Sequence, residues 1–196
     1  MKFEETAEYQ RGREAENVVV EFLRSRGVAV LPAYGMLDVD PSTKAPVLLL
    51  PKGERLVIPD LLAFCPTERM YWVEVKSKSV PGYFRIYQTQ THAIDYALYK
   101  EYLKIERITG IKVWIVIHEL VSGEILTISL ADIDRNGKRN PNWPNKNGLG
   151  SRCQQGGMWW RRDEMIILGV VKPDTLPVSG KPYAVDNGQV ESVGGT

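Results

Sequence analysis

Apolar residues recur at the spacing of an α-helix in two stretches of the chain. The first stretch, over 6–26, starts at Thr6, whose hydroxyl suits an N-cap, and ends before Gly27. The second, over 88–109, ends before Gly110. We therefore predict two amphipathic helices. Their apolar stripes are Val18, Val19, Phe22 and Leu23 in the first, and Ile94, Leu98, Tyr102 and Ile105 in the second.

Runs of β-branched and aromatic residues predict a series of strands. They cover 28–34, 47–50, 55–64, 70–77, 111–120, 124–130 and 158–171. Residues 134–158 are rich in Asn, Gly and Pro and predict a loop. A buried strand directly after the second helix fits a crossover return into the same sheet. The order of elements predicts an α/β fold with a mixed central β-sheet flanked by helices.

Two charged positions in the hairpin 55–77 face each other in the predicted register. If the five residues 65–69 form its loop, Asp60 lies across from Glu74, with Cβ atoms about 4.5–5.5 Å apart. Lys76 shares the face of Glu74 because strand side chains alternate. Two opposed carboxylates repel unless a cation lies between them, so this hairpin predicts a site for Mg²⁺, with Mn²⁺ able to substitute. The alternative is a solvated surface ion pair between Glu74 and Lys76.

Around that metal each group has an expected role. Asp60 and Glu74 would bind the ion, and the backbone carbonyl of Val75 would supply a further ligand. Lys76 would orient a metal-bound water or help to deprotonate it. The hairpin therefore predicts metal-assisted hydrolysis of a phosphodiester bond.

Composition places the chain among ordinary soluble proteins. Its 196 residues (22.2 kDa) are 43% apolar and 25% charged, and no apolar run approaches the length needed to span a bilayer. The start of the chain carries no signal-peptide core, so we expect a cytoplasmic protein without membrane contact. We expect one domain over 1–172, with a core of about 6–130, a basic Trp-containing loop and last strand over 131–172, and a loose tail over 173–196.

Basic residues gather in one segment, although the net charge is only +1. Between Arg135 and Arg162 there are seven basic residues and no acidic one, interleaved with tryptophans. Such a segment suits phosphate contacts and stacking on unpaired bases. A solvated polar loop, with the tryptophans in the core or at a partner surface, is the alternative. The tryptophans are Trp143, Trp159 and Trp160.

The sequences "PD" at 59–60 and "EVK" at 74–76 resemble the motif of the PD-(D/E)xK nuclease superfamily, which includes restriction endonucleases, Holliday-junction resolvases and phage nucleases. The first predicted helix is similar to that of the resolvase-like branch, with Gly12, Glu16 and Gly27 at the matching spacings. The resemblance covers roughly 12–117 and implies a restriction-endonuclease-like core. It implies that Glu16 joins the metal site, with Glu14 as its competitor on another face of the helix.

The resemblance further implies a divalent-metal-dependent endonuclease that hydrolyses DNA, structure-specific or of the restriction or phage type, and a homodimer. Its catalytic residues would be Glu16, Asp60, Glu74 and Lys76, with Gln90, His92 and Tyr96 as auxiliary residues on the second helix. We expect the DNA backbone to contact Arg11, Arg13, Lys78, Arg85, Lys138, Arg139, Arg152, Arg161 and Arg162. Two alternatives remain: a non-catalytic nucleic-acid-binding or assembly module with the same fold, and an unrelated α/β protein whose hairpin matches by accident.

Overall fold

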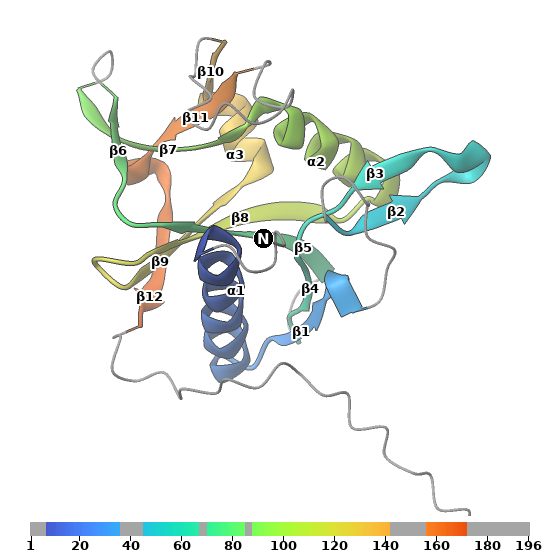
Figure 1. The fold of residues 1–196 in the computed structure, drawn as a ribbon, viewed down its shortest axis with the longest axis horizontal. Helices are drawn as coiled ribbons and strands as arrows, with labels where there is room; N and C mark the ends of the chain where they lie inside the picture. Colours follow the sequence, from blue (N-terminus) through green and yellow to red (C-terminus); the bar gives the residue numbers. More distant parts are fainter. Residues whose placement is uncertain (1–6, 36–44, 67–69, 85–87, 142–155, 172–196) are drawn as a thin grey trace, which may run out of the picture.

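A mixed six-stranded sheet with helices on both sides organises the protein (Figure 1). The computed structural model describes residues 7–35, 45–66, 70–84, 88–141 and 156–171. The strand order is β1-β4-β5-β8-β9-β12. These strands are β1 (Ala29–Pro32), β4 (Leu61–Phe64), β5 (Met70–Lys78), β8 (Lys112–Glu119), β9 (Glu124–Ser129) and β12 (Ile166–Val170). The mixed α/β fold expected from the sequence is confirmed.

β5 and β8 run parallel in the centre of this sheet, and its other neighbouring strands pair antiparallel. The helix α2 (Tyr96–Thr109) lies between β5 and β8 in the chain, so the predicted crossover return is confirmed. Its end is set by Gly110, which adopts a left-handed conformation (φ 68°) that glycine tolerates.

The other described strands form two smaller sheets. One has the order β10-β11-β7-β6, and the other pairs β2 with β3. Their strands are β10 (Lys138–Asn140), β11 (Gly157–Arg161), β7 (Thr89–Asp95), β6 (Gly82–Phe84), β2 (Val47–Leu49) and β3 (Arg55–Val57). Short 3₁₀ turns stand at η2 (Ala33–Gly35), η3 (Pro51–Gly53) and η5 (Arg162–Glu164).

The two faces of the central sheet pack into separate apolar cores. Helix α1 (Ala7–Ser25) buries Val19 against Val73 and Val75 of β5. On the opposite face, α2 and α3 (Leu130–Asn136) pack against alternate residues of the same strands. Figure 1 shows α1 on one side of β5 and β8. On the other side it shows α2, α3 and the four-stranded sheet β10-β11-β7-β6. Because side chains alternate along β5, Trp72, Glu74, Lys76 and Lys78 share the face of α2.

The predicted helix over 88–109 is wrong over its first eight residues, 88–95. Residues Thr89–Asp95 form β7, which pairs with β6 and β11, and α2 begins at Tyr96. Asp95 caps the helix by accepting a hydrogen bond from the Ala97 N–H at 3.0 Å. Residues 89–95 form a strand because they pair with β11, which is distant in the sequence. The local sequence of 88–95 carries no information about that pairing.

Two predicted strands are interrupted. The strand over 55–64 breaks at Ile58–Asp60, where Pro59 has no N–H to give to a ladder, and β4 starts at Leu61. The strand over 158–171 divides into β11 and β12 around η5. The predicted loop over 134–158 contains the end of α3, the strand β10 and the first two residues of β11. The rest of that loop, over 142–155, and the predicted tail lie outside the described residues.

Candidate active site

The predicted hairpin register is confirmed. Phe64 pairs with Met70 and Leu61 with Val73, so the residue preceding β4, Asp60, stands at the level of Glu74. Asp60 lies at a bend, is 7% exposed, and its Oδ2 accepts a hydrogen bond of 2.8 Å from the Val75 N–H. That bond fixes the Asp60 carboxylate beside β5.

Glu74 and Lys76 form an ion pair on the α2 face of β5. The Glu74 side chain is 3% exposed, whereas the Lys76 side chain is 32% exposed. Burial acts to lower the pKa of Lys76, but Glu74 and Asp60 more than offset it and raise that pKa above its ordinary value. Lys76 is therefore a cation at the mouth of a buried acidic site, and the pair is not an open surface ion pair.

Glu16 reaches the same site from α1. Its Oε2 accepts a hydrogen bond of 2.5 Å from Arg13, and burial followed by Glu74 raises its pKa against the lowering effect of Arg13 and Lys76. Glu14 is exposed and lines a separate pocket with Arg11 and His118. The structure thus brings Glu16, and not its competitor, to the acidic cluster.

Two tyrosines that the sequence did not indicate as site residues lie beside the buried carboxylates. Tyr102, on α2, is next to Glu74, and Tyr34, in η2, is next to Asp60. Burial, and then the carboxylate beside each one, raises the pKa of both tyrosines, which keeps them protonated donors. The Arg13 guanidinium lies 5.5 Å from the centre of the Tyr34 ring.

The charge balance of the cluster is unfavourable for three ionised acids. The pKa of Asp60 is raised by burial and then by Glu74, against the lowering effect of Lys76. Among the described residues, no three His, Cys, Asp or Glu side chains converge closely enough to bind one metal ion. The hard oxygens of Asp60 and Glu74 nevertheless suit a small divalent cation, which would relieve their repulsion. The structure places the Val75 amide, not its carbonyl, against Asp60, so the carbonyl ligand stays a prediction.

The expected auxiliary residues lie elsewhere than predicted. His92 and Gln90 are on β7, and Tyr96 is the first residue of α2, so they do not share a helix face. Gln90 is exposed, whereas His92 is buried with its Nε2 2.8 Å from Glu119 Oε1. Tyr96 stacks on Tyr99, with ring centres 5.8 Å apart. The structure therefore gives His92 and Tyr96 other partners than the active-site acids.

Several of the expected DNA-binding cations have protein partners. Arg13 binds Glu16, Arg161 binds Asp163, and Arg162 binds Glu119 and Glu124. The Arg139 guanidinium lies 4.3 Å from the centre of the Tyr96 ring. Glu119 and Glu124 thus bind the Arg162 guanidinium within the protein, and its contact with DNA stays a prediction.

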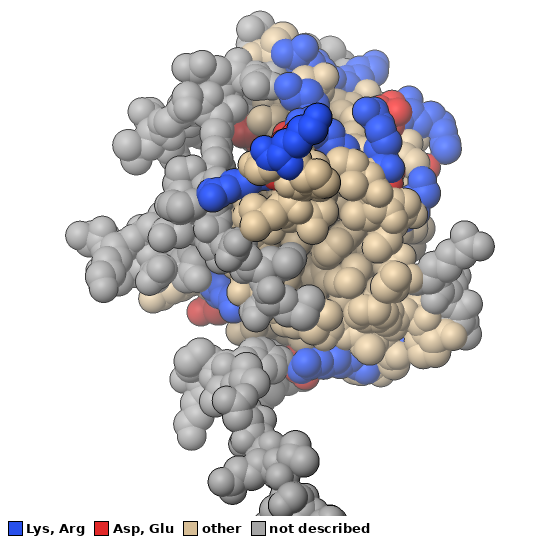
Figure 2. Space-filling model, turned by 90° about the vertical axis from the view of Figure 1, so that its right-hand side faces the viewer, with Lys and Arg blue, Asp and Glu red and all other residues tan. Residues whose placement is uncertain are grey.

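The other expected DNA-binding cations are exposed, are half-buried or lie outside the described residues. Arg11 and Lys138 are exposed, and Lys78 is half-buried. Figure 2 shows Lys and Arg side chains gathered at the upper end of one face. In Figure 1 this end of the molecule holds α2, α3 and the four-stranded sheet. Arg85 and Arg152 lie outside the described residues, as does Trp143.

Trp160 does not offer a surface for base stacking. It is 2% exposed and belongs to the core between the sheet and α2. Trp159 is half-buried beside Gly82. The core alternative therefore holds for Trp160.

Comparison with known proteins gives structural neighbours and no sequence relatives. No protein family and no curated protein matches the chain. A Holliday junction resolvase, Hjc of the archaeal hyperthermophile Archaeoglobus fulgidus, is similar over 78% of this chain and 90% of its own, with 12% identity and a TM-score of 0.47. D212, a nuclease from a fusselovirus, is similar over 83% of this chain and 87% of its own, with 14% identity and a TM-score of 0.41.

Among the described residues, no helix is both long and apolar enough to cross a membrane.

Proposed function

We propose that the protein is a divalent-metal-dependent nuclease that hydrolyses DNA phosphodiester bonds as an endonuclease. One observation carries the proposal: the hairpin register and α1 bring Glu16, Asp60, Glu74 and Lys76 to one buried site. An uncompensated group of buried carboxylates is costly to a folded protein unless a cation offsets it. Such groups are typical of functional sites.

Each residue of the cluster has a role in this proposal. Asp60 and Glu74 would hold Mg²⁺ or Mn²⁺, which supplies charge stabilisation for the phosphate and an activated water. The Val75 N–H holds Asp60, and the ion pair with Lys76 holds Glu74, which restricts the rotation of both carboxylates. Lys76, as a partly exposed cation, would orient the scissile phosphate or the water, and Glu16 would complete the acidic set.

The partner that we propose for this site is the DNA backbone. A polyanionic backbone would approach a cluster of three acids only where cations flank it or a metal compensates it. Action on both strands of a duplex would need two active sites, which a symmetric homodimer would supply.

The test incubates the purified protein with supercoiled, linear, single-stranded and branched DNA, each with Mg²⁺, Mn²⁺ or EDTA. We expect cleavage of at least one substrate with a divalent ion and none with EDTA. The matched variants are Lys76→Ala and Lys112→Ala, the second at the exposed far end of the parallel pair β5–β8. Absence of cleavage of every substrate would contradict the proposal, and DNA binding without cleavage would favour the non-catalytic module.

A further inference from the structure

Lys78 continues the row of charged residues that starts at Glu74. It lies at the end of β5, two residues beyond Lys76 and on the same face, a displacement of about 6.6 Å along the strand. In the parallel ladder its partner position is Glu119, the last residue of β8. Neighbouring positions of a ladder project to the same face, so Glu119 is the carboxylate with which Lys78 would ordinarily pair.

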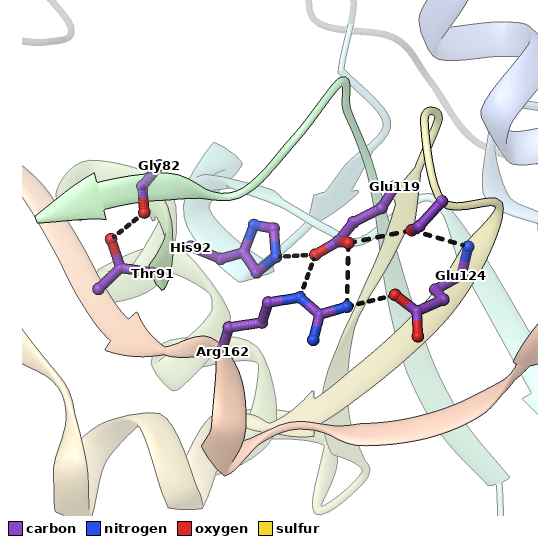
Figure 3. Close-up of polar contacts among 7 residues, drawn as sticks. Gly82, Thr91, His92, Glu119, Glu124 and Arg162 are labelled. Carbon is purple, nitrogen blue, oxygen red and sulfur yellow. Dashed lines mark hydrogen bonds and ion pairs between the residues drawn. The ribbon is translucent and has the colours of Figure 1, made fainter. Parts of the chain in front are cut away.

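Other donors occupy Glu119 instead (Figure 3). Arg162 binds it with two hydrogen bonds, Nε to Oε1 at 2.8 Å and Nη2 to Oε2 at 3.0 Å. The ring of His92 lies 2.8 Å from Oε1, and the Ser122 hydroxyl donates to Oε2 at 3.1 Å. The Glu119 side chain is 3% exposed. With both oxygens engaged twice, Glu119 has little capacity left for an ammonium group.

The pKa values of this network agree with its contacts. Burial acts to raise the pKa of Glu119, but the hydrogen bonds from Arg162 and His92 lower it below its ordinary value. Burial lowers the pKa of His92 despite the opposing effect of Glu119. Glu119 is thus an ionised, satisfied carboxylate next to a largely neutral imidazole at neutral pH.

Lys78 is left without an acidic partner within the part of the chain that the structure describes. Its pKa is lowered by burial and then by Lys76, the two effects expected for a half-buried cation beside another cation. Lys76 is different because Glu74 neutralises it. Among the described residues, Lys78 is therefore a positive charge without an acidic partner on the face between the proposed catalytic cluster and the Glu119 network.

We propose that Lys78 binds a backbone phosphate of the substrate strand, next to the phosphate at Lys76, and that Arg162 keeps Lys78 available by holding Glu119. This inference rests on the proposed function and names a phosphate contact for it. Lys78 is the binding residue. Arg162 is a positioning residue that acts through Glu119 and contacts no substrate.

The experiment measures the affinity of a fluorescently labelled DNA duplex and a branched DNA over a range of salt concentrations, with Ca²⁺ in place of Mg²⁺. Lys78→Ala should weaken binding to both DNAs by a similar factor and lower the salt slope by about 0.9, the value for one phosphate. Lys112→Ala, the control, should match the wild type. Wild-type affinity and salt slope in Lys78→Ala would overturn the inference.

A charge-swap cycle separates positioning from simple structure. Arg162→Gln should weaken DNA binding as Lys78→Ala does, because Glu119 is released to pair with Lys78. Glu119→Gln alone should bind at least as tightly as the wild type, and Arg162→Gln with Glu119→Gln should recover binding. Circular dichroism reports whether each variant is folded. A folded double variant that binds as weakly as Arg162→Gln would contradict the positioning role; if Arg162→Gln does not fold, Lys78→Ala and Glu119→Gln decide.

Failure of the proposed function has a different signature. A wild-type protein that binds neither DNA with any divalent ion would overturn the proposed function and the phosphate contact together. A wild-type protein that binds and cleaves DNA, with Lys78→Ala unchanged, would overturn the phosphate contact alone.

Discussion

Tyr102 on α2 is buried beside the carboxylate of Glu74 on β5, and burial followed by that carboxylate raises the pKa of the Tyr102 hydroxyl. The helix that returns the chain from β5 to β8 therefore also contributes a residue next to the acidic cluster. Tyr102 is 1% exposed, so packing holds its ring in place while the hydroxyl reaches the carboxylate.

Removing this hydroxyl should affect both stability and activity. We expect Tyr102→Phe to lower the free energy of unfolding by about 1–3 kcal/mol, since Glu74 would lose a polar neighbour in a buried place. Cleavage should slow because Glu74 is less well oriented. Denaturant unfolding and initial cleavage rates measure the two effects.

Tyr99→Phe is the matched control for that variant. Tyr99 lies on the same helix, and its hydroxyl donates to Asp134, an exposed residue of α3 outside the acidic cluster. Its loss should leave the cleavage rate near that of the wild type. Equal rates in the two variants would show that Tyr102 has no positioning role.

Stability without divalent ions should fall as the pH rises. The folded-state pKa values of Asp60 and Glu16 are raised above their unfolded-state values. Between the unfolded-state and the folded-state pKa of each carboxyl, the folded state therefore binds more protons than the unfolded state. Their contribution is present below the ordinary carboxyl pKa and is lost as the pH rises through the raised values. Thermal unfolding in EDTA from about pH 4 upward measures this dependence.

Asp60→Asn tests the origin of that pH dependence. The amide keeps an oxygen for the Val75 N–H but removes the charge that burial and Glu74 disfavour. We expect a higher melting temperature than the wild type at neutral pH in EDTA and a weaker pH dependence. A lower melting temperature at neutral pH with an unchanged slope would contradict the assignment.

Divalent ions should stabilise the wild type through the two carboxylates. At a hundredfold excess over its dissociation constant, a bound ion adds about 2.7 kcal/mol to the free energy of unfolding. Melting temperatures with Mg²⁺ or Mn²⁺ should rise for the wild type and for Glu54→Gln, an exposed acid outside the cluster. Glu74→Gln should respond little. An equal rise in both variants would place the ion elsewhere.

The sequence was sufficient for the register of the β4–β5 hairpin because the loop length sets it. Leu61–Phe64 and Met70–Val73 are apolar or aromatic enough to mark the strands, and the loop 65–69 follows from them. The same local reasoning gave α1, where the apolar stripe is long and Gly27 ends the helix. Glu16 was inferred from the motif resemblance, and in the structure Glu74 and Lys76 influence its pKa.

Contacts between distant segments were beyond local patterns. β7 is a strand because it pairs with β11, and Ile94 falls at helical spacing with Leu98 only by coincidence. Asp95 was an available signal for the true helix start, since aspartate is a common N-cap. The network of His92, Glu119 and Arg162 joins three segments, and each residue alone looks like an ordinary surface charge.

The role proposed for Lys76 and its acidic partners in DNA hydrolysis can be measured directly. The experiment compares cleavage rates of the wild type, Lys76→Ala and Lys112→Ala on the substrate that the wild type cuts best, with Mg²⁺ and at equal folded fraction. We expect a loss of about a hundredfold or more in Lys76→Ala and a wild-type rate in Lys112→Ala. A Lys76→Ala protein that cuts DNA as fast as the wild type would contradict it.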